Sequence, residues 1–346
     1  MTDKQWNDFV NVVNGVKPEK IPSGFIIDSP WLPKWYGIKI IDYLSNDDLW
    51  FDANMKAIET FPETWFLPGF WSEYGMCTEP SAFGAKCIFY ENEFPFAEKI
   101  INTTEDIDKI TKPNPETDGL LPFMLNRLKI MQERIEKAGH RIRFSVSRGP
   151  LNIATFLMGV SEFMMAIMLE PQLIHKLLEI ITEFLVEWHD LQCKTFPTVE
   201  GILVLDDIVG FIGKEEFKEF GLPYLKQIYY GREGIRFFHN DAECESSLEY
   251  YPEIGINLYN PGIYTTVNKI KDLTGNKMAV MGSIPPMDVL ANGDRKSVMQ
   301  AVERQIEGLA TRDRFILSCA GGMPPEVSSE NILAFLDAMA GKEKKN

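Results

Sequence analysis

The chain has 346 residues, of which 45% are apolar and 25% charged, and this ordinary globular composition excludes a disordered, collagen-like or coiled-coil protein. The formal net charge of -15 argues against nucleic acid and anionic membranes as partners, because both attract clustered Lys and Arg. The 5 cysteines are scattered without a CxxC pair and the start, MTDKQWNDF, is too polar for a signal peptide, so we expect reduced thiols, no membrane segment and a cytoplasmic location.

Short β-branched or aromatic runs, bounded by Gly, Pro, Asp or Asn, predict eight strands. In chain order these are Gly24–Asp28, Thr64–Leu67, Ile142–Ser147, Ile202–Asp206, Ile235–His239, Gly255–Tyr259, Met278–Met281 and Arg314–Ser318. Amphipathic stretches between them predict helices over Asp47–Phe61, Leu120–Ala138, Leu173–Cys193, Glu215–Tyr230, Ser247–Tyr251, Val267–Leu273, Lys296–Ala310 and Glu330–Ala340. Eight strands that are each followed by a helix predict an α/β fold, the (β/α)8 TIM barrel.

We expect residues 1–346 to form a single barrel domain. An aromatic-rich insertion follows the second strand, over about residues 68–115, and is too long for an ordinary βα loop. It is therefore either a functional segment, such as a lid, or a small subdomain. The basic tail Lys342–Lys345 predicts a frayed end over residues 342–346.

Polar side chains follow the predicted strands at their carboxyl ends, where a TIM barrel places its active site. They are Asp28, Arg148, Asp206, Asp207, His239, Asn240, Asp241, Tyr259, Asn260, Ser283 and Cys319. Helix capping also favours Asp, Asn and Ser at such positions, but it does not explain His239, Arg148 or Cys319. The pattern therefore favours a functional site.

The spacing of His239 and Asp241 points both side chains the same way at a strand end, so the two can converge on one metal ion. Both are acceptable zinc ligands, and Cys319 is a candidate third ligand from the last strand. Two alternatives stay open: His239 forms hydrogen bonds with Asp241 as its orienting partner, or it is a core histidine. One of Asp206 and Asp207 is expected to project into the barrel mouth, and a helix cap is the equal alternative.

Arg148 suits a carboxylate or phosphate on a ligand, with a buried ion pair as the rival interpretation. Aromatic side chains such as Trp31, Trp71 and Tyr74 suit a flat ring or a methylated cation, although most of them must pack the insertion onto the barrel. The chain contains no GxxxxGK[ST], GxGxxG, GxSxG or HExxH motif, which argues against phosphoryl transfer, dinucleotide redox chemistry, serine hydrolysis and thermolysin-like peptidases.

Several stretches in the same order along the chain resemble the uroporphyrinogen decarboxylase superfamily. They are Asn14–Pro22, Arg148–Gly159, Leu205–Ile228, the HNDA segment His239–Ala242, MGSIPPMDVL around Gly282, and Cys319–Ile332. The resemblance implies a single (β/α)8 barrel with one of two chemistries. Decarboxylases of this superfamily carry an arginine-rich motif after the first strand, whereas Ser29–Trp35 contains no arginine here, so decarboxylation is disfavoured.

The second chemistry is methyl transfer with a corrinoid protein. Relatives that methylate a thiol hold zinc with His-x-Cys and a distant Cys. In this chain His239 matches the first ligand, Asp241 replaces the first Cys, and Gly321 stands at the second Cys position with Cys319 two residues earlier. Relatives that demethylate a small donor are a better match, because they need an aromatic pocket and an electrophile or acid at the ether oxygen.

The resemblance therefore implies a corrinoid-dependent methyltransferase that moves a methyl group from a small methylated donor (an aryl methyl ether or a methylated amine) to the Co(I) of a corrinoid protein. The expected catalytic residues are His239, Asp241, Asp206 and Asp207, and the expected zinc ligands are His239, Asp241 and Cys319. The expected substrate-binding residues are Asp28, Trp31, Trp71, Tyr74, Glu79, Arg148, Tyr259 and Asn260. Transfer to a thiol or folate acceptor, uroporphyrinogen decarboxylation and a non-catalytic binding barrel are the alternatives, and the oligomeric state stays open.

Overall fold

The computed structural model describes residues 1–343 and has an α/β fold with parallel central strands. The strands are β1 Gly24–Ile26, β2 Trp65–Leu67, β5 Phe144–Arg148, β6 Gly201–Leu205, β7 Ile235–Asn240, β8 Leu258–Pro261, β9 Ala279–Ile284 and β10 Phe315–Cys319. Strands β5 to β10 pair in chain order, β1 pairs with β2, and a bridge between Ser23 and Leu317 joins the two sheets. Each predicted strand overlaps one of these, which confirms the (β/α)8 class. Within residues 1–343 no ladder joins β2 to β5, so the hydrogen-bonded ring is open there.

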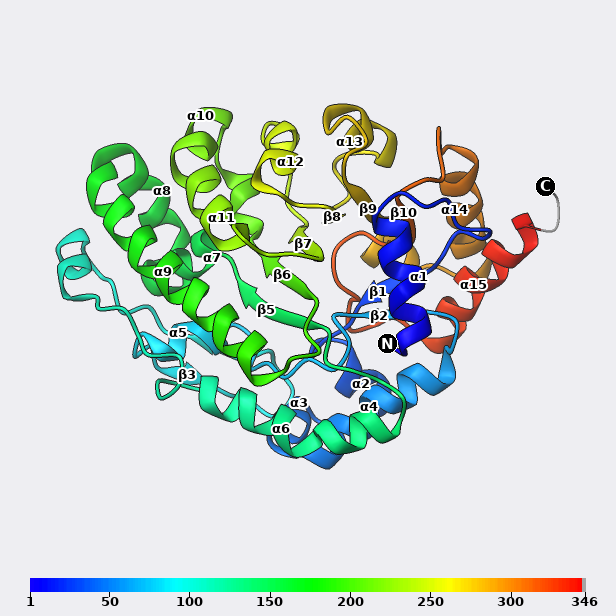
Figure 1. Ribbon diagram of the computed structural model, residues 1–346, viewed down its shortest axis with the longest axis horizontal. Helices are drawn as coiled ribbons and strands as arrows, with labels where there is room; N and C mark the ends of the chain where they lie inside the picture. Colours follow the sequence, from blue (N-terminus) through cyan, green and yellow to red (C-terminus); the bar gives the residue numbers. More distant parts are fainter. Residues whose placement is uncertain (344–346) are drawn as a thin grey trace.

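Helices surround the strands on the outside (Figure 1). They are α1 Asp3–Val13, α2 Leu32–Tyr36, α3 Ile40–Ser45, α4 Asp47–Thr60, α5 Thr78–Ala82, α6 Leu121–Lys137, α7 Pro150–Met158, α8 Val160–Leu169, α9 Pro171–Thr195, α10 Lys214–Glu216, α11 Leu222–Tyr229, α12 Tyr251–Ile254, α13 Val267–Leu273, α14 Arg295–Glu307 and α15 Ser329–Glu343. Local sequence sets their starts: Asn46 caps α4 by accepting from the Leu49 amide at 3.0 Å, and Pro171 opens α9.

The strands supply the centre of a core that is covered on both faces. Every residue of β5, β6 and β10 is buried, as expected of parallel strands between a filled barrel interior and outer helices. The buried apolar side chains form one cluster that extends from Met1 to Met339. That residues 1–346 make a single domain stays a prediction.

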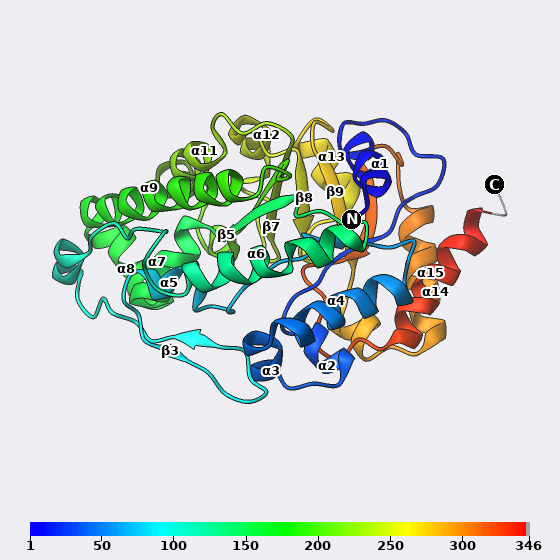
Figure 2. The same ribbon diagram turned by 60° about the horizontal axis from the view of Figure 1, so that its bottom comes forward.

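The insertion after β2 has secondary structure of its own. It contains α5, the short 3-10 helix η1 Thr104–Lys109, and a hairpin in which β3 (Cys87–Ile88) pairs antiparallel with β4 (Phe96–Ala97). Figure 2 shows β3 and the chain around it lying outside the barrel, near α3. The aromatic side chains of the insertion are divided: Phe70 and Trp71 are buried, whereas Phe89 and Tyr90 are exposed. The insertion thus packs its first part against the barrel and presents its hairpin to solvent.

The carboxyl-terminal helix α15 continues to Glu343, so its backbone includes the first two residues of the segment expected to be frayed. Residues 344–346 of that segment lie outside the described residues. Among residues 1–343, no single helix has the length and apolar composition needed to cross a membrane. Among these residues, the pair α7 and α8 has that length and apolar composition only when its two helices are taken together, and they are bent by 106° relative to each other.

Candidate active site

Three potential metal ligands converge at the carboxyl ends of two neighbouring strands. Asp207 opens the short helix η2 (Asp207–Phe211) after β6, and His239 and Asp241 lie at the end of β7. One ligand atom from each residue lies within 4.8 Å of the other two, and His239 Nε2 is 3.6 Å from Asp207 Oδ1. His239 is buried, Asp207 is partly buried and Asp241 is exposed, so the cluster faces solvent on one side.

Asn260 fixes the protonation and orientation of the His239 ring. Its Nδ2 donates to Met281 O at 2.7 Å and to Cys319 O at 3.4 Å, so its Oδ1 faces His239 Nδ1 at 2.7 Å. An amide oxygen only accepts, so Nδ1 donates the proton, and in the neutral tautomer the lone pair is on Nε2, which faces Asp207. This is how proteins prepare a histidine to bind a metal.

The two carboxylates of the cluster repel each other unless a cation separates them. Partial desolvation of its carboxyl group, followed by the charge of Asp207, raises the pKa of Asp241. The Asp241 amide also donates to Asp207 Oδ1 at 3.1 Å, which fixes the spacing of the pair. A neutral imidazole nitrogen with two carboxylate oxygens is a donor set that zinc accepts, so the residues present fit the metal that the sequence predicts.

Two glycines let neighbouring loops close on Asp241. A Cβ at Gly262, after β8, would collide with the Asp241 carbonyl oxygen. Gly321, after β10, has φ +68°, and a Cβ there would lie 3.1 Å from Asp241 Oδ2. Position 321 therefore borders the cluster but contributes no ligand, and this side of the cluster has no fourth protein donor among the residues that the structure describes.

Asp206 has a different role from Asp207. Its side chain is fully buried, and its two oxygens accept from the amides of Leu151 and Asn152 at 2.9 and 3.0 Å. These amides lie in the first turn of α7, whose own cap Gly149 has no side chain to offer. Asp207 joins the cluster, whereas Asp206 caps α7, which precedes β6, and not the next helix η2, to which it makes no side-chain cap. This geometry does not support the catalytic role expected of Asp206.

Cys319 does not join the cluster in the part of the chain that the structure describes. The side chain is completely buried, and its Sγ lies 3.5 Å from Gly321 O. Burial raises the pKa of its thiol to about 12. The group of possible ligands therefore differs from the expected zinc ligands: Asp207, and not Cys319, stands with His239 and Asp241.

Two aromatic residues expected to bind substrate belong to the core. Tyr259 precedes the inward-facing Asn260, so the alternation along β8 turns it outward, where its hydroxyl donates to Asn240 O at 3.1 Å. Trp31 is completely buried, donates from Nε1 to Val327 O at 3.0 Å and stacks on Trp35 at 5.0 Å between ring centroids. Neither ring lines the mouth, and this corrects their expected role.

The other expected substrate-binding residues gather at the ends of β1, β2 and β5. Glu79 Oε1 accepts from the Arg148 amide at 3.1 Å, and the Arg148 guanidinium lies 5.8 Å from the centre of the Trp71 ring. Burial, then the charge of Glu73, raises the pKa of Asp28 to about 8, while Arg148 opposes this shift. Asp28, Trp71, Glu79 and Arg148 thus form a second group, which we call the acid–arginine cluster.

Two further residues border the acid–arginine cluster. Glu73, which the sequence analysis did not single out, is buried and accepts from the amides of Ser29 and Gly75. The sequence signal that could have indicated Glu73 is its place in the pair Ser72–Glu73, which follows a predicted strand. Tyr74 is half-buried with the Arg127 guanidinium 5.6 Å from its ring centre, so this ring is already covered by a side chain of α6.

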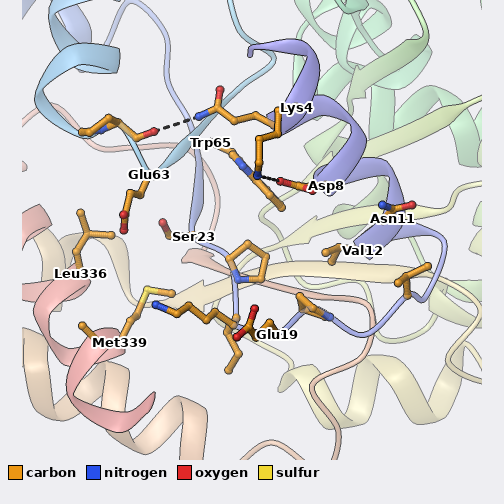
Figure 3. A pocket seen from close by; sticks show the side chains of 18 residues that line it. Lys4, Asp8, Asn11, Val12, Glu19, Ser23, Glu63, Trp65, Leu336 and Met339 are labelled. Atoms are coloured by element: carbon orange, nitrogen blue, oxygen red, sulfur yellow. Dashed lines mark hydrogen bonds and ion pairs between the residues drawn. The ribbon is translucent and has the colours of Figure 1, made fainter. Parts of the chain in front are cut away.

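A large cavity lies at the opposite end of the barrel. It has a volume of about 680 Å³ and lies at the amino ends of β1 and β2, between α1 and α15 (Figure 3). Its polar residues bond mainly among themselves, as in the 2.7 Å contact between Lys4 Nζ and Asp8 Oδ2. Active sites of TIM barrels occupy the carboxyl ends of the strands, so we assign the site to the mouth and not to this cavity.

Comparison with known proteins gives the family. Residues 7–341 match the family described as uroporphyrinogen decarboxylase (URO-D). A uroporphyrinogen decarboxylase from Pseudoalteromonas translucida is 24% identical over 277 residues, covering 76% of this chain and 75% of the relative. One from Photobacterium profundum is 24% identical over 332 residues, covering 89% of each.

Solved structures share the fold. A methyltransferase from Methanosarcina mazei has a TM-score of 0.82 at 17% identity and covers 97% of this chain and 98% of its own. A B12-independent methionine synthase from Shewanella sp. W3-18-1 has a TM-score of 0.55 at 11% identity, with 94% and 97% covered. With nearly its whole length matched by the family and by this fold, the chain belongs to the uroporphyrinogen decarboxylase family.

Proposed function

We propose that this protein is a methyltransferase that binds a divalent metal, zinc by preference, through Asp207, His239 and Asp241 and moves a methyl group from a small O-methyl donor to the Co(I) of a corrinoid protein. One observation carries the proposal: His239 Nε2 offers its lone pair to a point shared with two carboxylates, and glycine at position 321 adds no fourth ligand. Three protein ligands with one open position are typical of catalytic zinc sites.

The residues of the cluster have separate tasks in this reaction. His239 and the two aspartates hold the cation at the mouth, and Asn260 keeps the imidazole in the tautomer that binds. A bound zinc ion supplies Lewis acidity at the donor oxygen. When the methyl carbon passes to cobalt, the C–O bond breaks and its electron pair stays on the oxygen, which leaves readily only if its charge is neutralised.

This requirement separates the donor classes that the sequence left open. An ether oxygen has lone pairs for the cation and leaves as an anion, so it gains from the cluster. A quaternary ammonium has no lone pair and leaves as a neutral amine, so the same cluster offers it nothing. The cluster of two carboxylates and one imidazole therefore supports a methyl ether.

A corrinoid protein must reach the open side of the cluster. Large apolar side chains are exposed on the segments that follow β6, β8 and β9, namely Phe211, Ile263, Tyr264 and Met287. Exposed apolar side chains beside a site suit a docking partner. We propose that this rim receives the corrinoid protein and that the insertion over residues 68–115 closes the other side of the mouth as a lid.

Decarboxylation of uroporphyrinogen is the second candidate, because relatives with this name match over most of the chain. The segment Ser29–Trp35 argues against it. It contains no arginine to hold the substrate carboxylates, and its one cation, Lys34, pairs with Glu326.

The test is an anaerobic reaction of the purified protein with cob(I)alamin and a panel of methyl ethers, methylamines and betaines, following methylcobalamin by absorbance and metal content on the same sample. We expect methylcobalamin from a methyl ether. His239→Ala should lose the metal and lower the rate about 100-fold or more, with folding intact. His175→Ala is the matched control, because His175 on α9 bonds to Tyr224 at 2.6 Å, outside the cluster. Uroporphyrinogen turnover without any methylcobalamin would contradict the proposal.

A further inference from the structure

The Arg148 side chain is largely buried, and its guanidinium has no hydrogen-bonding partner among residues 1–343. The residue ends β5 and is only 7% exposed, yet within residues 1–343 its guanidinium makes no hydrogen bond and no ion pair shorter than 4.0 Å. The guanidinium carbon lies over the Trp71 ring, 5.8 Å from its centre. A guanidinium has five N–H donors, and no protein group among the described residues accepts from them here, so they are available to a ligand that accepts hydrogen bonds.

Other buried polar atoms, on Glu79 and on the segments that follow β1 and β2, are also unpaired among the described residues. Glu79 is 1% exposed, and its Oε2 has no hydrogen-bonding partner among the described residues. The same holds for the hydroxyl groups of Ser29 and Ser72, which follow β1 and β2. Buried polar atoms in folded proteins are almost always hydrogen-bonded, so several unpaired ones on one side of the mouth point to a polar group that binds there.

The hydrogen-bonding character of this side indicates the class of ligand. Arg148 can only donate, and serine hydroxyls can donate as well. Burial raises the pKa of Glu79, and burial together with Glu73 raises the pKa of Asp28 to about 8, which favours a protonated Asp28 carboxyl group that also donates. A site made of donors suits an anion, and the planar fork of a guanidinium matches a carboxylate with two parallel hydrogen bonds.

The register of the sheet relates this side to the metal-ligand cluster. Arg148 pairs with Leu205, and Leu205 pairs with His239, so the three residues lie at one level and their side chains point to the same face. Neighbouring strands are about 4.8 Å apart, which separates the backbones of Arg148 and His239 by about 10 Å. A small acid whose ring holds a methoxy group and a carboxylate apart can contact both sides at once.

We propose that Arg148, with Glu79 and Asp28 beside it, forms a carboxylate-binding subsite, and that the methyl donor is the methyl ether of a small ring-bearing acid. The identity of the donor rests on the proposed methyl transfer, whereas the carboxylate subsite itself does not. Binding of an acid can therefore be measured without cobalt chemistry.

The experiment compares 4-methoxybenzoate with its neutral analogue 4-methoxybenzamide by isothermal titration calorimetry on the full chain without corrinoid. We expect the acid to bind about tenfold or more tightly than the amide, as a charge-assisted fork does. Arg148→Met, which keeps the volume of the side chain, should remove this preference, and Arg148→Lys should keep part of it. Arg134→Met is the matched control, because Arg134 also lies over an aromatic ring, that of Phe51 at 4.2 Å, but on α6 outside the mouth.

Equal binding of acid and amide to the wild-type protein would overturn the subsite, and so would tighter binding of tetramethylammonium than of the acid. If Arg148→Met does not fold, the affinities of the wild-type protein and of Arg148→Lys for the acid and the amide still test the subsite. Acid binding without methylcobalamin from any ether keeps the subsite and rejects the proposed function. Methyl transfer from neutral ethers, with no preference for acids, would support the proposed function and reject the carboxylate subsite.

Discussion

The two sides of the barrel mouth differ in how completely the protein satisfies their polar groups. On the β7–β8 side, His239 bonds to Asn260, and Asn260 in turn bonds to the backbone of β9 and β10. On the β1–β5 side, Glu79 Oε2 is buried without a hydrogen-bonding partner, and the largely buried Arg148 makes no side-chain hydrogen bond among the described residues. The first side is oriented before anything binds, as a metal site requires, and the second depends on its ligand to complete its hydrogen bonds.

Replacement of Asp206 should give the largest effect, because this residue joins the two sides by tying the end of β6 to the first turn of α7 just after Arg148. Asp206→Ala leaves two buried amides without partners, and we expect the free energy of unfolding to fall by about 3 kcal/mol. Urea unfolding measures this. Asp294→Ala is the control: it removes the exposed cap of α14, which accepts from Ser297 at 2.8 Å, and should cost only about 1 kcal/mol. Equal losses in the two variants would contradict the joining role.

Asn260→Leu tests whether the first side is oriented by the protein. Leucine has a similar volume but accepts no hydrogen bond, so the ring of His239 loses the partner that fixes its tautomer. We expect metal affinity, measured by competition with a chelator, to fall about 10- to 100-fold while the fold is retained. Unchanged affinity would mean that the Asp207–His239–Asp241 cluster does not need this orientation.

The fold was predictable from the sequence because the strands are short β-branched runs separated by helical periodicity, and both patterns are local. The convergence of His239 and Asp241 was also predictable from their spacing, because the alternation of side chains along a strand is a local pattern too. The prediction placed both Tyr259 and Asn260 in the site, whereas alternation along β8 brings only Asn260 of the two to His239.

Other parts of the site depend on contacts between distant segments. The capping of α7 by Asp206 and the register of Arg148 with His239 both require the sheet to be assembled. The protonated state of Cys319 follows from complete burial, which a strand-end position alone does not reveal. The sequence alone therefore indicated which residues to consider, but not which side chain or backbone group each of them contacts in the folded protein.

Asp28→Asn tests the electrostatics of the second side. The folded-state pKa of Asp28 is about 8, above an unfolded value near 4, so between these values the folded chain keeps a proton that the unfolded chain has lost. The stability of the wild-type protein therefore falls as pH rises through this window, by at most about 1.4 kcal/mol per pH unit. Asparagine does not titrate, so the variant should gain stability relative to wild type between about pH 5 and pH 8 in urea unfolding. A difference independent of pH would contradict this.

Cys319→Ala should have the smallest effect on the metal site, and it separates the two ligand sets that sequence and structure favour. The thiol is completely buried and protonated, since its pKa is raised to about 12, and it lies outside the Asp207–His239–Asp241 cluster. We expect the same metal content by elemental analysis, the same affinity in chelator competition, and a loss of about 1 kcal/mol of stability from the small cavity. Loss of the metal would instead mean that Cys319 is a ligand and Asp207 is not. In that case β10 would supply a metal ligand to the β7–β8 side, in addition to the Cys319 carbonyl that accepts from Asn260.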